Sequence, residues 1–257
     1  MGCALTLLVV AIGSLAGVLA PFDPFALVGP PLAAPSRAFP MGTDGLGRDV
    51  LSGVIYGART SLLIAVSVGL LALAIGVLVG ALAGYRGGGL DDLLMRVTEV
   101  FQVLPRFFLA IVVISLFGAG LDRLILVLGL TSWPLLARVV RAEILAFKQL
   151  EFVEAAVASG ASNMRLLIRE LLPNALPPVI VYVALLLAQV MLLEASLGFL
   201  GLGDPDVMSW GYLAAQAQQF LRVGWWMWFF PGVALIVAVL GFNLLGDALT
   251  DSLGGRR

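Results

Sequence analysis

The stretch QLEFVEAAVASGASNMRLLIRELLP, residues 149–173, is polar and helical within a chain that is otherwise mostly apolar. Apolar residues recur at the spacing of an amphipathic helix on both sides of Gly160, which interrupts the pattern. Ser162 is placed to cap the second helix, and Pro173 is expected to end it. The apolar positions are Leu150, Val153 and Val157 before the glycine, and Met164, Leu167, Ile168 and Leu171 after it. Two short amphipathic helices between membrane spans predict a docking surface for a soluble partner. The less specific interpretation is an ordinary connector.

The composition of the whole chain indicates a membrane protein. Of its 257 residues, 61% are hydrophobic and 12% are charged, and the mean hydropathy is +1.06. In soluble domains, roughly a quarter of the residues are charged. Apolar stretches long enough to cross about 30 Å of hydrocarbon recur along the chain. We therefore predict a polytopic helical protein of the cell (plasma or inner) membrane.

The residue types needed for most chemistry are missing or occur once. A net charge of −1 argues against nucleic-acid binding, and the absence of histidine removes the usual catalytic base, proton relay and metal ligand. Cys3 is the single cysteine, which excludes internal disulfides. Lys148 is the single lysine, and no GxxxxGK[ST] stretch is present to cradle ATP phosphates. We predict a non-enzymatic chain with no metal site and no cofactor of its own.

The predicted fold class is all-α, a bundle of six transmembrane helices. The spans are expected at residues 3–20, 61–84, 104–119, 121–141, 175–199 and 228–249. The first resembles a secretory signal, but it lacks a basic leading region and Pro21 follows the plausible cleavage site, so a retained anchor is expected. Residues 1–60 would form an anchor span with an extracytoplasmic segment, and residues 61–257 a five-span core that carries the loop 149–173.

Charge asymmetry predicts the orientation. If both termini are cytoplasmic, ten basic residues lie inside and five lie outside. The inside set is Arg86, Arg96, Arg106, Arg138, Arg141, Lys148, Arg165, Arg169, Arg256 and Arg257; the outside set is Arg37, Arg48, Arg59, Arg123 and Arg222. This orientation places the loop 149–173 in the cytoplasm.

Polar residues in the loops predict local structure. Glycines 42, 45 and 47 permit tight turns, and Asp44, Arg48 and Asp49 are expected to pair locally and to cap a helix at Val50. A helix is also expected to start at Asp91, where an acidic residue complements the helix dipole. Trp210, Trp225, Trp226 and Trp228 around the last outer loop are typical of an interfacial aromatic belt.

Ionisable and amide side chains inside the predicted spans are candidate functional groups. Glu194, near the outer end of span five, is either a translocation-path residue or a hydrogen-bonded brace. Gln189 is expected to line the same face. Asn243 and Asp247 are four residues apart in span six and are predicted to brace one helix against another.

The loop 149–173 resembles the EAA loop of ABC importer permeases. The matching residues are Glu154, Ala155, Ala156, Gly160, Leu172 and Pro173. In that family the loop is the coupling helix that fits a groove in the ATPase subunit, so the resemblance implies ATPase coupling by these residues. The loop after Tyr85 also resembles the family, and implies either a minor second ATPase contact or a membrane-surface helix.

Two further motifs resemble the dipeptide, oligopeptide and nickel permeases, and within them the C-type partner of a permease pair. The first is GTDGLGRD, with Gly42, Thr43, Asp44, Gly47, Arg48 and Asp49; the second is SLGFLGLG from Ser196. The closing FNLLGDALTD also resembles the family, with Thr250 where the family commonly has arginine.

The resemblance implies a type I ABC importer permease fold. It also implies a second homologous permease, two ATP-binding cassette subunits that bind ATP and Mg, and an extracytoplasmic substrate-binding protein. A di- or oligopeptide is the expected substrate, with nickel and glutathione as alternatives. The rivals from other classes are an ion-coupled secondary carrier and a scaffold subunit. We find no convincing internal repeat, which such carriers tend to show.

Overall fold

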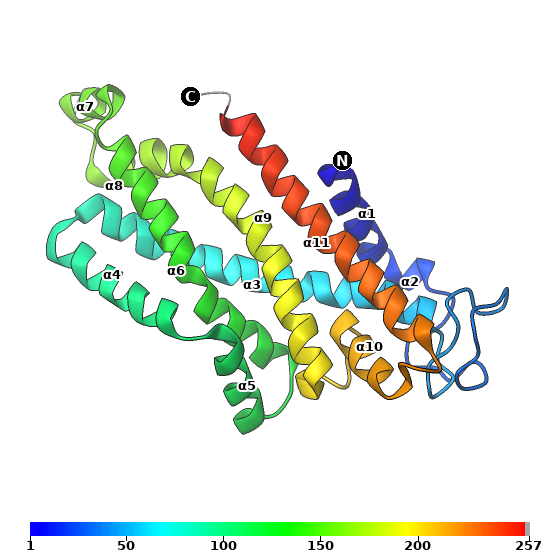
Figure 1. Ribbon diagram of the computed structural model, residues 1–257. Helices are drawn as coiled ribbons and strands as arrows, with labels where there is room; N and C mark the ends of the chain where they lie inside the picture. The colour runs from blue at the N-terminus through cyan, green and yellow to red at the C-terminus, as the bar shows by residue number, and fades with distance from the viewer. Residues whose placement is uncertain (255–257) are drawn as a thin grey trace.

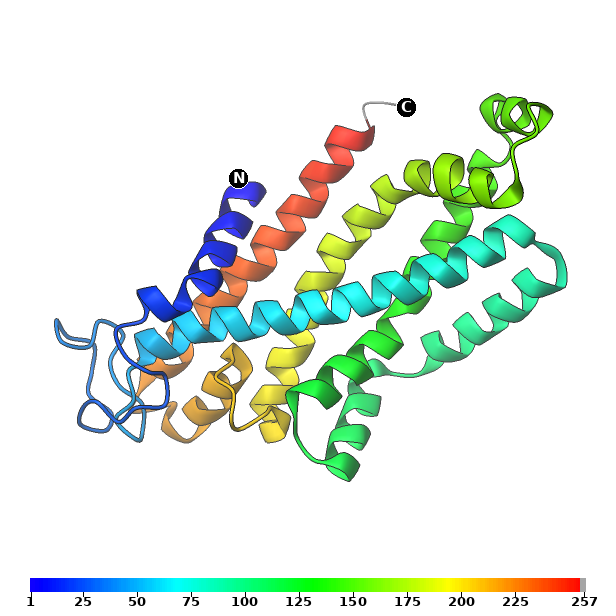
Figure 2. The same cartoon turned by 180° about the vertical axis from the view of Figure 1, so that it is seen from behind.

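The computed structural model describes residues 1–254, and these fold into a bundle of helices with irregular connections (Figures 1 and 2). The elements are α1 (Gly2–Ser14), α2 (Ala16–Leu19), α3 (Val50–Arg86), α4 (Gly88–Val103), α5 (Arg106–Phe117), α6 (Leu121–Phe147), α7 (Glu151–Ala158), α8 (Asn163–Arg165), the π-helical turn η1 (Leu166–Leu171), α9 (Leu172–Leu197), the π-helical turn η2 (Gly198–Leu202), α10 (Trp210–Ala217), the 3₁₀ turn η3 (Gln218–Phe220) and α11 (Trp225–Gly254). The predicted all-α class is confirmed for this part of the chain. Arg256 and Arg257 lie outside the described residues.

The pair α3 and α6 forms the centre of the bundle. Their contact is a line of glycines on α3 at four-residue spacing, Gly76, Gly80 and Gly84. A β-carbon at Gly76 would lie 2.6 Å from Leu136 Cβ, and one at Gly84 would lie 2.9 Å from the Arg141 carbonyl oxygen. Small residues at this spacing let membrane helices approach closely without a hydrophobic driving force between them.

The predicted count of six spans is not confirmed. Four helical stretches are long and apolar enough to cross a membrane: Val50–Arg86, Leu121–Phe147, Asn163–Leu202 and Trp225–Ser252. The pair α4 and α5 makes a fifth if it is one span bent by 75°. The predicted first span is broken at Leu15 into α1, a shorter apolar helix, and α2.

The helix that contains the predicted second span, residues 61–84, begins at Val50, eleven residues before that span. Asp49 caps α3 at Val50, as the sequence predicted, and accepts the Ser52 N–H at 2.8 Å. At 37 residues α3 is about 55 Å long, so it extends well beyond the hydrocarbon core. The predicted division at residue 60 falls inside this helix, and α1 packs against both α3 and α11.

The prediction that Pro173 ends a helix is wrong. Pro173 lies in the first turn of α9, and the helical path runs through it from Asn163 to Leu202. The missing proline N–H is accommodated because the preceding turn, η1, is widened into π-helical geometry. The predicted start of a helix at Asp91 is wrong by one turn, since α4 begins at Gly88.

The hairpin around α7 and the loop of residues 20–49 lie at opposite ends of the molecule (Figures 1 and 2). The start of α1 and the end of α11 lie on the side of α7, whereas α5 and α10 lie on the side of the loop (Figure 1). The fold thus separates the sequence motifs into two distant regions.

Candidate functional site

The hairpin, residues 150–168, consists of α7, the following turn, α8 and the start of η1. It projects from one end of the bundle (Figure 1). Gly160 has a positive φ of +80°, a conformation that favours glycine, and it separates the two helices. The Ser162 hydroxyl accepts the Arg165 N–H at 3.4 Å and caps α8. The predicted glycine break and serine cap are both confirmed.

The apolar side chains of the hairpin and of η1 differ in exposure. Val153, Leu166 and Leu171 are buried against the bundle. Four other apolar positions that the sequence analysis assigned to the docking surface have exposed side chains. These are Leu150 (45%), Val157 (56%), Met164 (66%) and Ile168 (54%), and Phe152, which the sequence analysis did not single out, joins them at 40%. Exposed apolar side chains on a projecting element are characteristic of an interaction surface.

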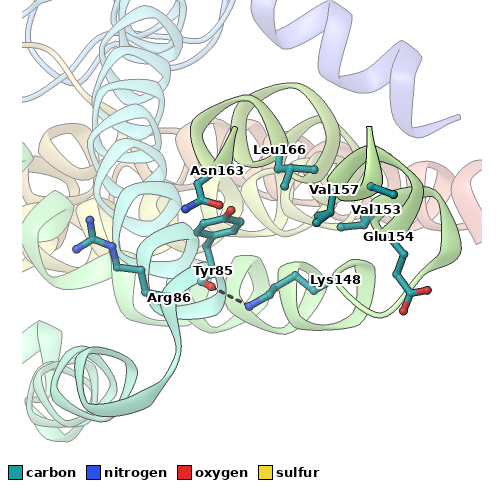
Figure 3. Close-up of a pocket in the computed structure, with 9 residues that line it drawn as sticks. Tyr85, Arg86, Lys148, Val153, Glu154, Val157, Asn163 and Leu166 are labelled. Carbon is teal, nitrogen blue, oxygen red and sulfur yellow. Dashed lines mark hydrogen bonds between the residues drawn. The ribbon is translucent and has the colours of Figure 1, made fainter. Parts of the chain in front are cut away.

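A cavity of 650 Å³ lies between the hairpin and the end of α3 (Figure 3). Its walls are formed by Tyr85, Arg86, Lys148, Val153, Glu154, Val157, Ala158, Asn163 and Leu166. Lys148 donates from Nζ to the Tyr85 carbonyl oxygen at 2.8 Å, and its ammonium lies 5.4 Å from the centre of the Tyr85 ring. These contacts anchor the start of the hairpin to α3 and leave the cavity open beside Glu154.

The structure places the predicted coupling residues in two neighbouring groups. Glu154, Ala155 and Gly160 are exposed on the hairpin, and Ala156 is half-buried beside them. Leu172 and Pro173 lie instead in the first turn of α9, beyond η1, where Leu172 is half-buried and Pro173 exposed. The first group forms the projecting surface, whereas the second belongs to the helix that supports it.

A partly buried ion pair, which the sequence analysis missed, braces the same end of the bundle. The Arg141 guanidinium donates from Nε and Nη2 to the two carboxylate oxygens of Asp91, both at 2.6 Å. Such a bidentate pair fixes the orientation of both partners. It joins α4 to the part of α6 that leads into the hairpin. The two residues are fifty positions apart in sequence, so local patterns carry no sign of it.

The motif of residues 42–49 forms a tightly bonded turn at the opposite end. The Thr43 hydroxyl donates to the Pro30 carbonyl at 2.6 Å and accepts the Ala33 N–H at 2.8 Å. Asp44 accepts the N–H groups of Leu46 and Arg48, both at 2.8 Å. Gly42 and Gly47 have φ values of +74° and +85°. The motif therefore organises its own backbone.

The predicted local pairing of the charged side chains of this motif is wrong for Arg48. Its guanidinium donates to the Tyr212 hydroxyl at 3.1 Å and lies 5.2 Å from the centre of the Phe25 ring. Trp226 donates from its indole nitrogen to the Thr43 carbonyl at 2.9 Å. The motif is thus joined to α10 and α11. Arg48 Nε and Asp49 Oδ1 are buried without a hydrogen-bond partner among the described residues.

Glu194 is 2% exposed and lies in a hydrogen-bonded junction of three elements. It accepts hydrogen bonds from the Ser209 hydroxyl at 2.6 Å and from the Ser61 hydroxyl at 3.1 Å. This is the geometry of the predicted brace. Gln189 is exposed, and five residues along an α-helix correspond to a rotation of about 140°. The expectation that Gln189 and Glu194 share a face is therefore wrong.

The predicted helix–helix brace of Asn243 and Asp247 is not formed within the described residues. Asn243 donates to the Val239 carbonyl at 2.9 Å, which belongs to its own helix, and Asp247 is exposed.

Comparison with known proteins identifies a family and close relatives. The family of binding-protein-dependent transport system inner membrane components matches residues 76–257. A putative peptide permease protein of Brucella suis biovar 1 (strain 1330) is 42% identical over 227 residues, which cover 87% of this chain and 75% of the relative. The di/tripeptide transport system permease protein DppC of Pseudomonas aeruginosa (strain UCBPP-PA14) is 36% identical over 260 residues, 98% of this chain and 86% of the relative.

The fold also matches a solved structure. An inward-facing structure of the MetNI methionine ABC transporter contains a chain that superimposes with a TM-score of 0.63 at 22% sequence identity. The match covers 77% of this chain and 95% of that chain. At this identity the match establishes the type I importer fold of the bundle.

Proposed function

The chain belongs to the family of binding-protein-dependent transport system inner membrane components, and we propose on that basis that it is the permease subunit of an ATP-driven peptide importer. Its membership makes it a multi-pass membrane transport subunit. The peptide assignment is supported by the names of relatives that are 36–42% identical over most of the chain. Nickel complexes and glutathione are the alternative cargoes.

The observation that carries the proposal is the projecting hairpin with its exposed apolar side chains. We propose that Glu154, Ala155, Ala156 and Gly160 contact an ATPase subunit, and that Leu172 and Pro173 transmit its motion into α9. A docked ATPase would cover Val157 and Met164, which are more than half exposed in the chain alone. A rigid path from hairpin to bundle is available, because η1 and α9 continue the helix without a break.

The proposed assembly contains two permeases, two ATP-binding cassette subunits and an extracytoplasmic binding protein. ATP and Mg would be held by the cassette subunits. Both termini would lie in the cytoplasm, which is supported by the basic residues of the hairpin and by the position of α1 and α11 relative to α7 (Figure 1). The loop of residues 20–49 would then face the binding protein.

The orientation is tested by cysteine labelling. In a Cys3→Ser background, we expect a cysteine at Ser162 to react with an impermeant maleimide only in opened cells, and one at Ser36 to react in intact cells. Both serines are exposed, so access through the protein does not limit the reaction. The opposite pattern would reverse the proposed topology and place the hairpin on the side of the membrane that a cytoplasmic ATPase cannot reach.

The transport proposal is tested by affinity purification and reconstitution. We expect two cassette subunits and a second permease to co-purify with the tagged chain, and proteoliposomes containing them to accumulate a labelled tripeptide only with ATP and loaded binding protein. Accumulation by the lone chain under an ion gradient would support the rival secondary carrier. Uptake of nickel or glutathione in place of the tripeptide would correct the substrate.

A further inference from the structure

Arg106 lies at a break between α4 and α5, at the level of the middle of α6. It is the first residue of α5, directly after Pro105, where α4 and α5 meet at a bend of 75° (Figure 1). Its guanidinium donates to the Ser132 hydroxyl at 3.5 Å. Ser132 is buried in α6, about 17 Å along the axis from the start and about 23 Å from the end of that helix.

The positive charge of Arg106 has no carboxylate partner in the described part of the chain. The ion pairs between α4 and α6 are Asp91 with Arg141 and Glu99 with Arg138, so both carboxylates are already engaged. A guanidinium has five N–H donors, and the long contact to Ser132 uses one of them. Charged groups at such depth are costly, and they usually face a protein interior or water where they serve transport.

A buried hydroxyl lies on α9, a helix that contacts α5. The hydroxyl belongs to Tyr182, in the first half of α9. The hydroxyl is buried and has no hydrogen-bond partner among the described residues. An unpartnered hydroxyl on α9 and a guanidinium without a carboxylate partner at the start of α5 thus lie on two helices that contact each other.

Polar residues continue from Tyr182 along one face of α9. Gln189 follows at i+7 and is exposed, which places it about 10 Å nearer the outer end on the same face. Ser196 follows at a further seven residues and is also exposed, although its hydroxyl donates to the Leu192 carbonyl. A polar line on an otherwise apolar membrane helix is more consistent with a water-accessible surface than with lipid.

We propose that Arg106 and Tyr182 form an anion-binding station in the translocation path, and that it receives the terminal carboxylate of the peptide after it passes Gln189. This inference rests on the proposed peptide-import function. The guanidinium matches a carboxylate in geometry, and the start of α5 adds the favourable end of a helix dipole at a discontinuous span. Lipid phosphates lie at the membrane interface rather than at this depth, which favours a transported anion.

The test uses the complete transporter in proteoliposomes with loaded binding protein. Uptake of a labelled tripeptide is compared with uptake of its C-terminal amide, and the acid-to-amide ratio is measured for wild type, Arg106→Gln and Arg106→Lys. The binding protein is the same in every arm, so its own preference cancels between them. Arg96→Gln, an exposed arginine on the neighbouring α4, is the matched control for loss of one charge.

We expect Arg106→Gln to lower the acid-to-amide ratio about tenfold, with normal recovery of the second permease and retained ATPase stimulation. Arg106→Lys should restore part of the ratio, Tyr182→Phe should lower it less than Arg106→Gln, and Arg96→Gln should match wild type. An unchanged ratio in Arg106→Gln, or equal losses of uptake for the acid and the amide, would contradict the proposed anion-binding station.

Loss of the second permease from purified Arg106→Gln would also overturn the station, because the charge would then pair with the partner subunit. Failure of the wild-type complex to import any peptide is a different result. It would reject the proposed function, and this inference would fail with it.

Discussion

The hairpin of residues 150–168 and the loop of residues 20–49 both contain motifs that the sequence analysis identified, yet the side chains of the two motifs differ in burial and in hydrogen bonding. In the loop, Thr43 and Asp44 are buried and hydrogen-bonded to backbone groups, and the Trp226 indole N–H donates to the Thr43 carbonyl. In the hairpin, Val157 and Met164 are exposed. A motif that builds structure satisfies its own polar groups, whereas a motif suited to docking leaves apolar surface uncovered for a partner.

Two glycines with the same backbone conformation give the sharpest form of this contrast. Gly47 and Gly160 have φ values of +85° and +80°. A β-carbon at Gly47 would overlap the Gly29 carbonyl oxygen, whereas one at Gly160 would have no neighbour within 4 Å. A residue other than glycine would therefore have the same backbone strain at both positions, and only the crowding around its side chain would differ.

The largest loss of stability is expected for Gly47→Ala. The substitution combines a strained φ with an overlap against backbone that cannot move easily, which together cost about 3 kcal/mol or more. Gly160→Ala adds the strain alone, about 1 kcal/mol. Unfolding by SDS in mixed micelles measures both. Equal losses for the two variants would show that crowding in the loop does not matter and would remove the contrast.

A smaller loss is expected at the junction around Glu194. Glu194→Leu leaves the Ser61 and Ser209 hydroxyls without their acceptor and should cost about 2–3 kcal/mol and reduce the yield of assembled complex. Glu194→Gln keeps an oxygen acceptor of the same shape and should cost about 1 kcal/mol or less. Assembly and uptake are measured in both variants. Normal assembly of Glu194→Leu would contradict the brace, and lost uptake with normal assembly in Glu194→Gln would restore a path role.

Thr43→Val tests the loop at a single hydrogen-bonding group. The substitution keeps the shape of the side chain but leaves the Pro30 carbonyl and the Ala33 N–H without their partner, at a cost of about 2 kcal/mol. Ser36→Ala is the matched control, because its hydroxyl accepts the Phe39 N–H at 3.2 Å at an exposed position of the same loop. The thermal midpoint in detergent should fall for Thr43→Val and stay nearly constant for Ser36→Ala. A similar change in both would mean that burial does not set the value of these bonds.

Features that depend on neighbouring residues could be predicted from the sequence, whereas contacts between residues distant in sequence could not. Gly160 and Ser162 could be placed because a turn and a helix cap depend on neighbouring residues. The pairing of Asp91 with Arg141 could not, because it depends on how α4 lies against α6. One readable signal was overlooked: the spacing of Gly76, Gly80 and Gly84 predicts a close helix contact.

One error in the prediction concerns the tryptophans. The tryptophans were assigned to an interfacial belt, which suits the exposed Trp225 and Trp228 but not Trp210 and Trp226, which are 3% and 5% exposed. Their indole N–H groups bond to the Val54 and Thr43 carbonyls, contacts that only the folded chain brings together.

The smallest loss of stability is expected in the hairpin, where the effect should appear in transport instead. Gly160→Trp has room for its side chain in the chain alone and should cost about 1 kcal/mol, so the protein should insert normally. A docked ATPase would meet the indole, and uptake should fall by at least about tenfold. Gly160→Ala is the matched control, because it carries the same backbone strain without the bulk, and its uptake should stay close to wild type. Uptake and ATP hydrolysis are measured at equal expression. Wild-type uptake by Gly160→Trp would separate the hairpin from coupling, and equal losses in the two variants would assign the effect to strain at this turn rather than to docking.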